Sequence, residues 1–412
     1  MTNPTGTTSD KITTQKSPKP EAFHVSGWDH WLSGLIARHP AKWIRLGNFE
    51  TKMAADAIAD IEIEKPIFVA GLARSGSTIL LETLAQHPDA ATHQYRDYPP
   101  VFTPWFWNRF VDLAPGKKNV AVERTHADGI NITPESPEAF EEMIWMAFFR
   151  HLHDVGDNNT LDEHISNPAF EAFYRDHIRK LIHVRGGTRY VSKANYLVTR
   201  MEYLLSLFPD ARFVLPVRDP VWHIASLIKQ HTLFCAGEQN NPRAVAHMQR
   251  VGHFEFGLDR RPINTGDLHA TLDIMNLWKN GKEIEGWAHY WSNLHHYLAD
   301  RLTVNKGLEK ATLVMRYEDL VADPAGKLRA LFDHTGLADA QPIIDRVAPT
   351  IHAFLKSVMV AFAARRRMEE IPPGKHKHNN RHDRQIPTRD IRDQNSNKSG
   401  KDHKSQKRHR AV

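Results

Sequence analysis

Residues 66–78 read PIFVAGLARSGST and outline a phosphate-binding loop: a short apolar run, a turn of small residues and the start of a helix. Gly71 and Gly76 have the spacing of the pattern G-x-x-x-x-G-K-[ST], but Ser77 stands where that pattern has lysine. A cation is present three positions upstream, as Arg74. Because the missing lysine normally reaches the β- and γ-phosphates, the loop predicts a nucleotide with a 5′-phosphate rather than a magnesium-bound triphosphate. A plain strand-to-helix turn is the alternative for this stretch taken alone.

Apolar runs followed by segments with helical spacing predict alternating strands and helices. The runs lie at 66–70, 189–193, 212–217 and 312–317. The helical segments begin at Thr78, span 197–209 and 221–231, and resume near Pro324 with Asp323 as N-cap. This alternation implies parallel pairing with helices on both faces. We therefore expect an α/β fold, a three-layer parallel sheet flanked by helices.

Two long segments without strong strand signals, at roughly 95–185 and 232–305, are expected to be helical inserts that shape a second binding site. Residues 138–152 and 285–302 have helical spacing. The run 95–110 holds seven aromatic residues, which either stack on an acceptor molecule or form core beneath a helical cap.

The composition, 41% hydrophobic and 25% charged, places the 412-residue chain in the soluble globular class. No apolar run approaches the roughly 20 residues of a membrane span, and the N-terminal residues lack the apolar core of a secretory signal. The one cysteine, Cys235, excludes an intramolecular disulfide and suits a reducing compartment. We therefore expect a cytoplasmic protein.

The chain is expected to comprise a disordered leader (1–21), one catalytic domain (22–373) and a basic disordered tail (374–412). Residues 375–412 hold six Lys and six Arg against four Asp, with no Glu and no aromatic residue. Such a segment cannot bury a core. A solvated terminus is favoured over an arm that binds nucleic acid or a membrane surface.

A second motif lies in RFVLPVRDPVWHIASLIKQH, residues 212–231. Arg218 ends an apolar strand, and Ser226 follows eight residues later in a helix. Taken alone, Arg218 paired with Asp219 and Ser226 on the helix surface is the simpler interpretation. Combined with the loop, the two residues can hold a second phosphate of one nucleotide.

The two motifs together resemble the sulfotransferase superfamily, which uses 3′-phosphoadenosine-5′-phosphosulfate (PAPS), and in particular its bacterial members. The resemblance covers roughly residues 66–340, including 208–220 and 316–337. It implies the P-loop NTPase-like sulfotransferase fold, with PAPS as the donor and no metal. It also implies that the 5′-phosphosulfate is held by Arg74, Ser75, Gly76, Ser77 and Thr78, and the 3′-phosphate by Arg218 and Ser226.

Lys193 follows a predicted strand and resembles a lysine that the family often places near the transferring group, where it would stabilise charge on the departing oxygen. An exposed lysine at a strand end is the alternative. The acceptor also needs a base to take its proton. The candidates are Asp97 first, then His126 and His93. A surface position for His126 and a pairing of Asp97 with Arg96 are the alternatives.

These features predict a PAPS-dependent sulfotransferase that acts by in-line displacement on a hydroxyl or amine, on a carbohydrate or other small molecule. We expect no nucleic acid partner and no transmembrane segment. One alternative is a P-loop kinase, which the missing lysine disfavours. The other is a non-catalytic nucleotide-binding protein whose basic tail tethers it to nucleic acid.

Overall fold

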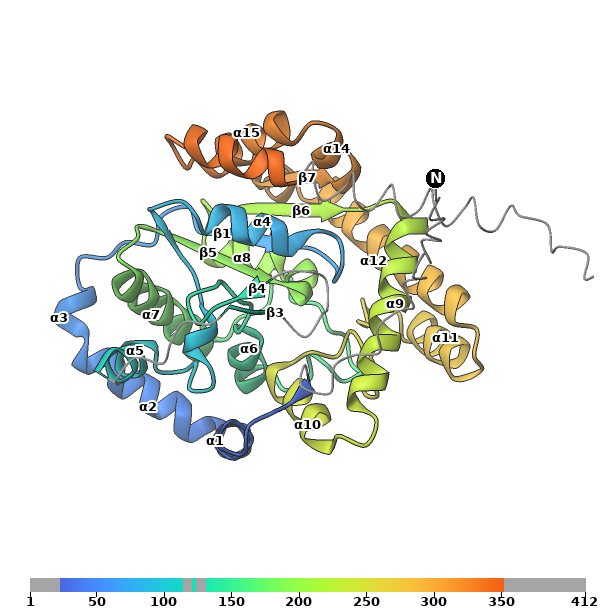
Figure 1. Ribbon diagram of the computed structural model, residues 1–412, viewed down its shortest axis with the longest axis horizontal. Helices are drawn as coiled ribbons and strands as arrows, with labels where there is room; N and C mark the ends of the chain where they lie inside the picture. Colours follow the sequence, from blue (N-terminus) through green and yellow to red (C-terminus); the bar gives the residue numbers. More distant parts are fainter. Residues whose placement is uncertain (1–22, 114–120, 124–130, 352–412) are drawn as a thin grey trace, which may run out of the picture. The chain divides into compact units, whose positions relative to one another are not determined.

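The computed structural model describes residues 23–113, 121–123 and 131–351. A five-stranded parallel sheet runs through it in the order β2-β5-β1-β6-β7 (Figure 1). The strands are β1 (Ile67–Ala70), β2 (Ala90–Ala91), β5 (Arg189–Ala194), β6 (Arg212–Val217) and β7 (Thr312–Arg316). The predicted α/β architecture is therefore confirmed, and the loop of residues 71–76 follows the central strand.

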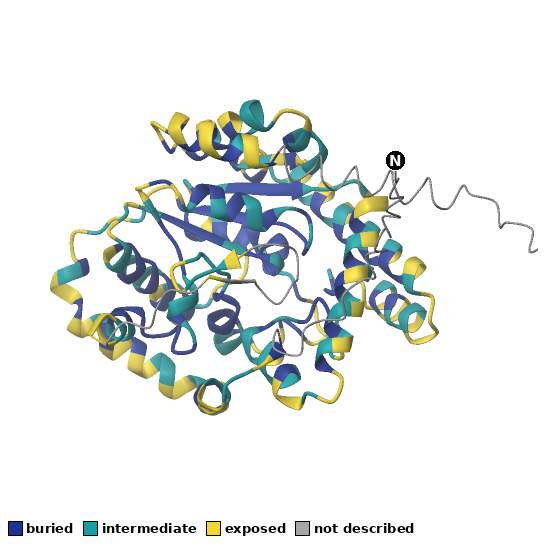
Figure 2. Cartoon of the chain, viewed as in Figure 1, coloured by how far each residue is buried: buried dark blue, intermediate teal, exposed yellow. Residues whose placement is uncertain are grey.

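Side chains of β1 alternate between two apolar cores, because successive residues of a strand point to opposite faces of the sheet. Ile67 and Val69 pack in a core with α4, α14 and α15, whereas Phe68 and Ala70 pack in a larger core with α7, α8 and α12. All four are fully buried, as a parallel sheet covered on both faces requires (Figure 2). The covering helices are α4 (Ser77–Leu84), α7 (Pro168–Arg185), α8 (Met201–Leu207), α12 (Glu283–Val304), α14 (Tyr317–Ala322) and α15 (Pro324–Thr335).

The two long inserts are largely helical, as expected, and the first also contains a short antiparallel pair, β3 (Val122–Glu123) with β4 (Asn131–Ile132). The remaining elements are η2 (Tyr95–Asp97), α5 (Pro104–Leu113), α6 (Glu142–Phe148), η3 (Asn195–Thr199), α9 (Pro220–Glu238), α10 (Pro242–Val251), α11 (Leu268–Lys279) and α13 (Lys306–Ala311).

The helix expected over 138–152 is shorter in the structure, where α6 spans only Glu142–Phe148. Residues before it pair with the segment that contains η2: Tyr95 N–H donates to the Ser136 carbonyl, and Glu138 N–H donates to the His93 carbonyl. These bonds hold Glu138 outside the helix. The N-cap expected at Asp323 is confirmed, since its side chain accepts the N–H of Gly326.

Three helices that the sequence analysis did not predict precede β1: α1 (Gly27–Arg38), α2 (Pro40–Met53) and α3 (Ala55–Ile58). In Figure 1, α1 and α2 run below α5 and α7, and α3 lies to their left. None of the helices in the described ranges has both the length and the apolarity that crossing a bilayer requires.

Candidate active site

The loop between β1 and α4 is a close backbone turn at the carboxyl end of the central strand. Gly76 has a φ of 102°, and a Cβ there would lie 2.8 Å from the ring of Tyr317. A Cβ on Gly71 would lie 2.6 Å from Pro216 and 2.7 Å from Ser75 Oγ. That hydroxyl is buried and lacks a hydrogen-bond partner among the described residues. Since a buried polar atom without a partner is costly, Ser75 is suited to donate to an anion held by the loop.

The second predicted motif meets this loop directly. Arg74 Nε donates to Ser226 Oγ at 3.3 Å, and Arg218 Nη1 donates to the Arg74 carbonyl, also at 3.3 Å. The Arg218 guanidinium lies over the ring of Tyr317, and its Nε is buried without a hydrogen-bond partner in the described part of the chain. Asp219 caps α9 by accepting the N–H groups of the next turn. The residues expected to hold two phosphates therefore form one cluster with unused donors.

A buried histidine fixes the loop from behind. His223 Nε2 lies 2.8 Å from the Ala73 carbonyl, and Trp291 Nε1 donates to His223 Nδ1 at 3.2 Å. Burial lowers the pKa of His223 to about 3, so the ring is neutral and carries its proton on Nε2. The loop is thus tied to α12. Trp291 packs against the main apolar core, and its indole N–H also supports the loop.

Lys193 lies on the neighbouring strand, near the end of β5 and in register with Val69 of β1. A cavity of about 250 Å³ opens where the carboxyl ends of these strands meet, the usual ligand position in open α/β sheets. Arg74, Thr78 and Lys193 contribute to its polar side. The inserts supply most of an apolar side, formed by Tyr95, Tyr98, Phe140, Tyr196, Phe234, Met248, Val251 and Phe256.

Asp97, the first candidate for the base, lies in a buried charged network and does not line this cavity. Its carboxylate accepts hydrogen bonds from Arg185 Nη2 (2.6 Å), Asn108 Nδ2 (2.9 Å) and a backbone N–H. Burial alone would raise the pKa of Asp97, but the bond with His93 and the charge of Arg185 hold it well below its usual range. These contacts argue against a role in proton transfer.

His93 belongs to the same network. Its Nδ1 lies 3.1 Å from Asp97 Oδ2, and its Nε2 lies 2.9 Å from His177 Nε2. Both ring nitrogens are therefore engaged, and the side chain is buried. His126, the remaining candidate, lies outside the described residues.

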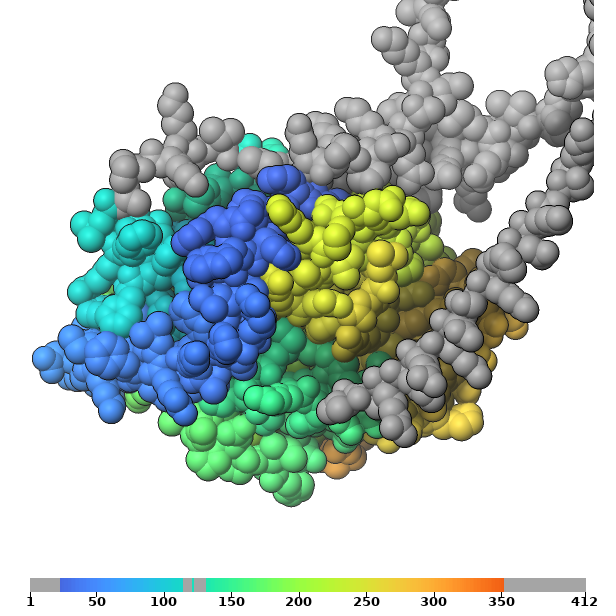
Figure 3. Space-filling model, turned by 90° about the horizontal axis from the view of Figure 1, so that it is seen from below, coloured from blue at the N-terminus to red at the C-terminus, as the bar shows by residue number. Residues whose placement is uncertain are grey.

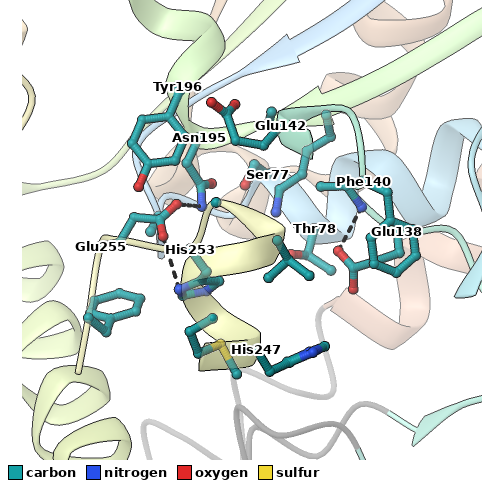
Figure 4. Close-up of a pocket in the computed structure, with 18 of the residues that line it drawn as sticks. Ser77, Thr78, Glu138, Phe140, Glu142, Asn195, Tyr196, His247, His253 and Glu255 are labelled. Atoms are coloured by element: carbon teal, nitrogen blue, oxygen red, sulfur yellow. Dashed lines mark hydrogen bonds and ion pairs between the residues drawn. The ribbon is translucent and has the colours of Figure 1, made fainter. Parts of the chain in front are cut away.

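Another histidine, His253, does line the cavity (Figure 4). It follows the end of α10, where Gly252 adopts the left-handed conformation (φ 75°) and reverses the chain. His253 Nδ1 lies 3.0 Å from Glu255 Oε2, and Asn195 Nδ2 donates to Glu255 Oε1 at 2.6 Å. Burial lowers the pKa of His253, but the Glu255 carboxylate outweighs it, so that the net shift is upward. A carboxylate thus orients a histidine at the cavity wall.

Two further carboxylates line the cavity, in different environments. Glu142 accepts hydrogen bonds from Arg200 and lies 2.6 Å from His153 Nε2. Burial would raise the pKa of Glu142, but Arg200 and His153 lower it to about 2, as in a structural ion pair. Glu138 is half-buried and accepts the N–H of Ala139 at 2.7 Å.

The sequence analysis missed His253, Glu255 and Asn195. The only local signal was the sequence GHFE at 252–255, a histidine and a carboxylate two residues apart after a glycine. Nothing in that pattern indicates that the segment faces Lys193, because the proximity arises from the packing of an insert against the end of the sheet.

The parallel α/β sheet, with a glycine-containing loop between its central strand and α4, is the architecture expected from the sequence. A model of the sulfotransferase family matches residues 66–260. The omega-hydroxy-beta-dihydromenaquinone-9 sulfotransferases Stf3 of Mycobacterium bovis and Mycobacterium tuberculosis are each 24% identical to this chain over 318 residues, 73% of this chain and 69% of theirs. The resemblance to sulfotransferases expected from the sequence is therefore confirmed, over residues 66–260 for the family model.

Two solved structures are also similar. Sulfotransferase STF1 from Mycobacterium tuberculosis shares 15% identity with a TM-score of 0.44, over 77% of this chain and 80% of that one. Sulfotransferase STF9 from Mycobacterium avium shares 14% identity with a TM-score of 0.40, over 72% of this chain and 71% of that one.

Proposed function

We propose that this protein transfers a sulfuryl group from PAPS to a hydroxyl group on a largely apolar acceptor. The observation that carries the proposal is the junction of the loop with Arg218 and Ser226 beside Lys193. This junction supports the proposal because it brings two sets of groups suited to bind anions next to a cavity with an apolar wall.

The proposed PAPS site is argued from buried hydrogen-bonding groups that have no partner among the described residues. Ser75 Oγ and the backbone N–H groups at the start of α4 would bind the 5′-phosphosulfate, with Arg74 and Thr78 at its edge. Arg218 and Ser226 would bind the 3′-phosphate, to which a guanidinium is well matched. Ser77, in place of the lysine of triphosphate-binding loops, supports this donor over the kinase alternative.

The base proposed here differs from the first candidates, whereas Lys193 keeps the role expected for it. His253 would take the acceptor's proton on Nε2, because the contact with Glu255 favours the tautomer protonated on Nδ1. Lys193 would stabilise negative charge on the departing phosphate oxygen. PAPS would supply the sulfuryl group, whose bond to that oxygen breaks as the bond to the acceptor oxygen forms. Glu138 is the second candidate for the base, since it lines the same cavity.

The acceptor is expected to be more apolar than the carbohydrate considered first. Aromatic and aliphatic side chains dominate the wall opposite the loop, and such surfaces favour apolar ligands. The Stf3 relatives are named for a hydroxylated menaquinone derivative, which supports an apolar alcohol here. The cytoplasmic location, the limits of the domain and the role of the tail remain predictions.

Calorimetry with adenosine 3′,5′-bisphosphate and with AMP tests the donor site, since the two ligands differ only in the 3′-phosphate. We expect the parent to bind the bisphosphate more tightly, and Arg218→Ala to remove most of that preference. The loss of a charged hydrogen bond predicts a weakening of roughly 10- to 100-fold. Arg212→Ala, at the opposite end of β6, is the matched control and should leave both affinities unchanged. Equal affinities in the parent and Arg218→Ala would refute the assignment.

A further inference from the structure

Exposed large apolar side chains gather on three helices: α1 and α2, which precede β1 in the chain, and α5, which follows β2. Among the described residues, seven of the sixteen such side chains lie on α1, α2 and α5. We call these seven the aromatic face: Trp28, Trp31, Leu46, Phe49, Met53, Phe110 and Leu113. Leu46, Phe49 and Met53 recur at helical spacing and so form one stripe along α2. Trp28 and Phe49 are 61% and 54% exposed. Clusters of exposed apolar side chains of this kind mark interaction sites on protein surfaces.

The neighbouring side of α2 is fixed to the domain, whereas the side chains of the stripe are exposed. Glu50 is fully buried and accepts a hydrogen bond from Lys180 of α7 at 2.7 Å. A Cβ on Gly47 would lie 2.6 Å from the ring of Phe173, which shows how closely the two helices pack. Phe49 and Phe106 have ring centroids 6.3 Å apart, so the exposed surface continues from α2 onto α5.

Cationic side chains accompany the aromatic face. Lys42, Arg45 and Lys52 are exposed on α2, and Arg38 and Arg109 are exposed on α1 and α5. The acidic residues of the same helices offset this charge only in part, because Glu50 is buried with Lys180 and Asp112 pairs with Arg96. Aromatic residues together with Lys and Arg on one side of a helix are typical of segments that lie in the headgroup region of a membrane.

We propose that the aromatic face docks on an anionic lipid surface, from which the protein takes its acceptor. Figure 3 shows α1 and α2 (blue) on one face of the molecule, between α5 (cyan) and the segment around α10 (yellow-green). A partner protein would explain the apolar residues equally well, but the surrounding cations match the charge of phospholipid headgroups.

A single helix, α10, separates this surface from the cavity. On one side, Arg250 donates to the His30 carbonyl and to Ser33 Oγ of α1, at 2.7 and 3.1 Å. On the other side, Met248 and Val251 line the cavity. A lipid alcohol extracted beside α1 would therefore have a short path to the proposed base.

The size of the cavity agrees with such an acceptor. About 250 Å³ is below the roughly 300–1,000 Å³ of sites that enclose a whole ligand, so a long molecule would insert only its hydroxyl end. The remaining chain would stay in the bilayer. This step rests on the proposed function, whereas docking on the membrane does not.

Flotation with phospholipid vesicles tests the docking. We expect the full chain to float with vesicles of phosphatidylcholine and phosphatidylglycerol, and much less with phosphatidylcholine alone. Trp31→Ala/Phe49→Ala should weaken vesicle binding by about tenfold or more, because binding scales with the apolar area inserted. Leu272→Ala/Ile284→Ala removes equally exposed side chains from α11 and α12 (51% and 68%) and should bind as the parent does. Lys42→Gln/Arg45→Gln should lose the preference for phosphatidylglycerol.

Each variant is also titrated with adenosine 3′,5′-bisphosphate, and unchanged affinity shows that the fold and the donor site are intact. Absence of vesicle binding by the parent, or equal binding by Trp31→Ala/Phe49→Ala, overturns the docking. So does a dimer of the parent that dissociates in that variant without any vesicle binding, since the face would then join two copies. Vesicle binding without affinity for the bisphosphate would instead refute the proposed function and leave the docking in place.

Discussion

Two histidine–carboxylate pairs in this molecule have nearly the same separation and different surroundings. His93 and Asp97 approach to 3.1 Å, and His253 and Glu255 approach to 3.0 Å. The first pair is buried in a network in which His177 holds the second ring nitrogen and Arg185 covers the carboxylate. The second pair lies at the wall of the cavity that contains Lys193.

The comparison shows that the contact between a histidine and a carboxylate does not by itself define a base. In the buried pair, Arg185 offsets the charge of the Asp97 carboxylate and His177 contacts the second ring nitrogen of His93. The pair therefore stabilises the position of the segment that contains η2. In the second pair, Glu255 is also buried and accepts a hydrogen bond from Asn195, but His253 lines the cavity. Access to the cavity therefore separates the structural role of the first pair from the catalytic role proposed for the second.

The largest effect is expected for His253→Gln. Loss of the proposed base should lower kcat by roughly 10²- to 10⁴-fold, while affinity for adenosine 3′,5′-bisphosphate stays within about twofold of the parent. Initial rates of sulfuryl transfer and calorimetry measure the two quantities. If the rate survives in this variant but falls in Glu138→Gln, the base is Glu138 and the comparison fails.

Asp97→Asn should act on stability instead. Breaking a buried ion pair typically costs about 3 kcal/mol or more of the free energy of unfolding. Because the pKa of Asp97 is lowered in the folded state, its contribution is present above its unfolded pKa of about 4 and disappears as the pH falls through the folded value. The difference between variant and parent should therefore be largest near neutral pH. Denaturant unfolding at several pH values measures it.

The same variant decides between two roles for Asp97. A structural role predicts that the folded fraction of Asp97→Asn retains a turnover close to that of the parent. If Asp97→Asn is as stable as the parent and has no turnover, Asp97 acts as the base.

A smaller effect is expected for Glu255→Gln. The carboxylate raises the pKa of His253, so its removal should lower that pKa and move the acid limb of kcat/KM to lower pH. The loss of orientation should reduce kcat by about tenfold. Glu142→Gln cannot serve as a control for Glu255→Gln, because it breaks a structural ion pair with Arg200. An acid limb that does not move would show that His253 is not the group being titrated.

Much of the fold was predictable because it is encoded locally. The strands 66–70, 189–193 and 212–217 are apolar runs that precede helical segments, and the structure contains β1, β5 and β6 at these places. The helices α1 and α2 were missed because the exposed aromatic residues of α2 obscure the usual contrast between an apolar and a polar side. The start of α6 was misplaced because long-range backbone bonds to residues 93–96 hold Glu138 in an extended segment.

The donor side of the site was predictable for a similar reason. Arg74, Arg218 and Ser226 lie in contiguous motifs whose strands are neighbours in the sheet, so their contact follows from the topology. The acceptor side was not predictable, because His253 and Glu255 come from an insert whose path no local pattern determines. Asp97 was chosen for its position in sequence, and only the structure shows Arg185 against it.

The hydrogen bonds through His223 have a consequence for redesign of the molecule. The ring donates to the Ala73 carbonyl and accepts from Trp291, so replacing His223 or Trp291 leaves an atom of the other without its partner. Positions 223 and 291 are 68 residues apart in the chain, yet they support the loop as one unit. A redesign of the helical insert around α12 would thus have to keep this tryptophan, or rebuild the support of the loop at the same time.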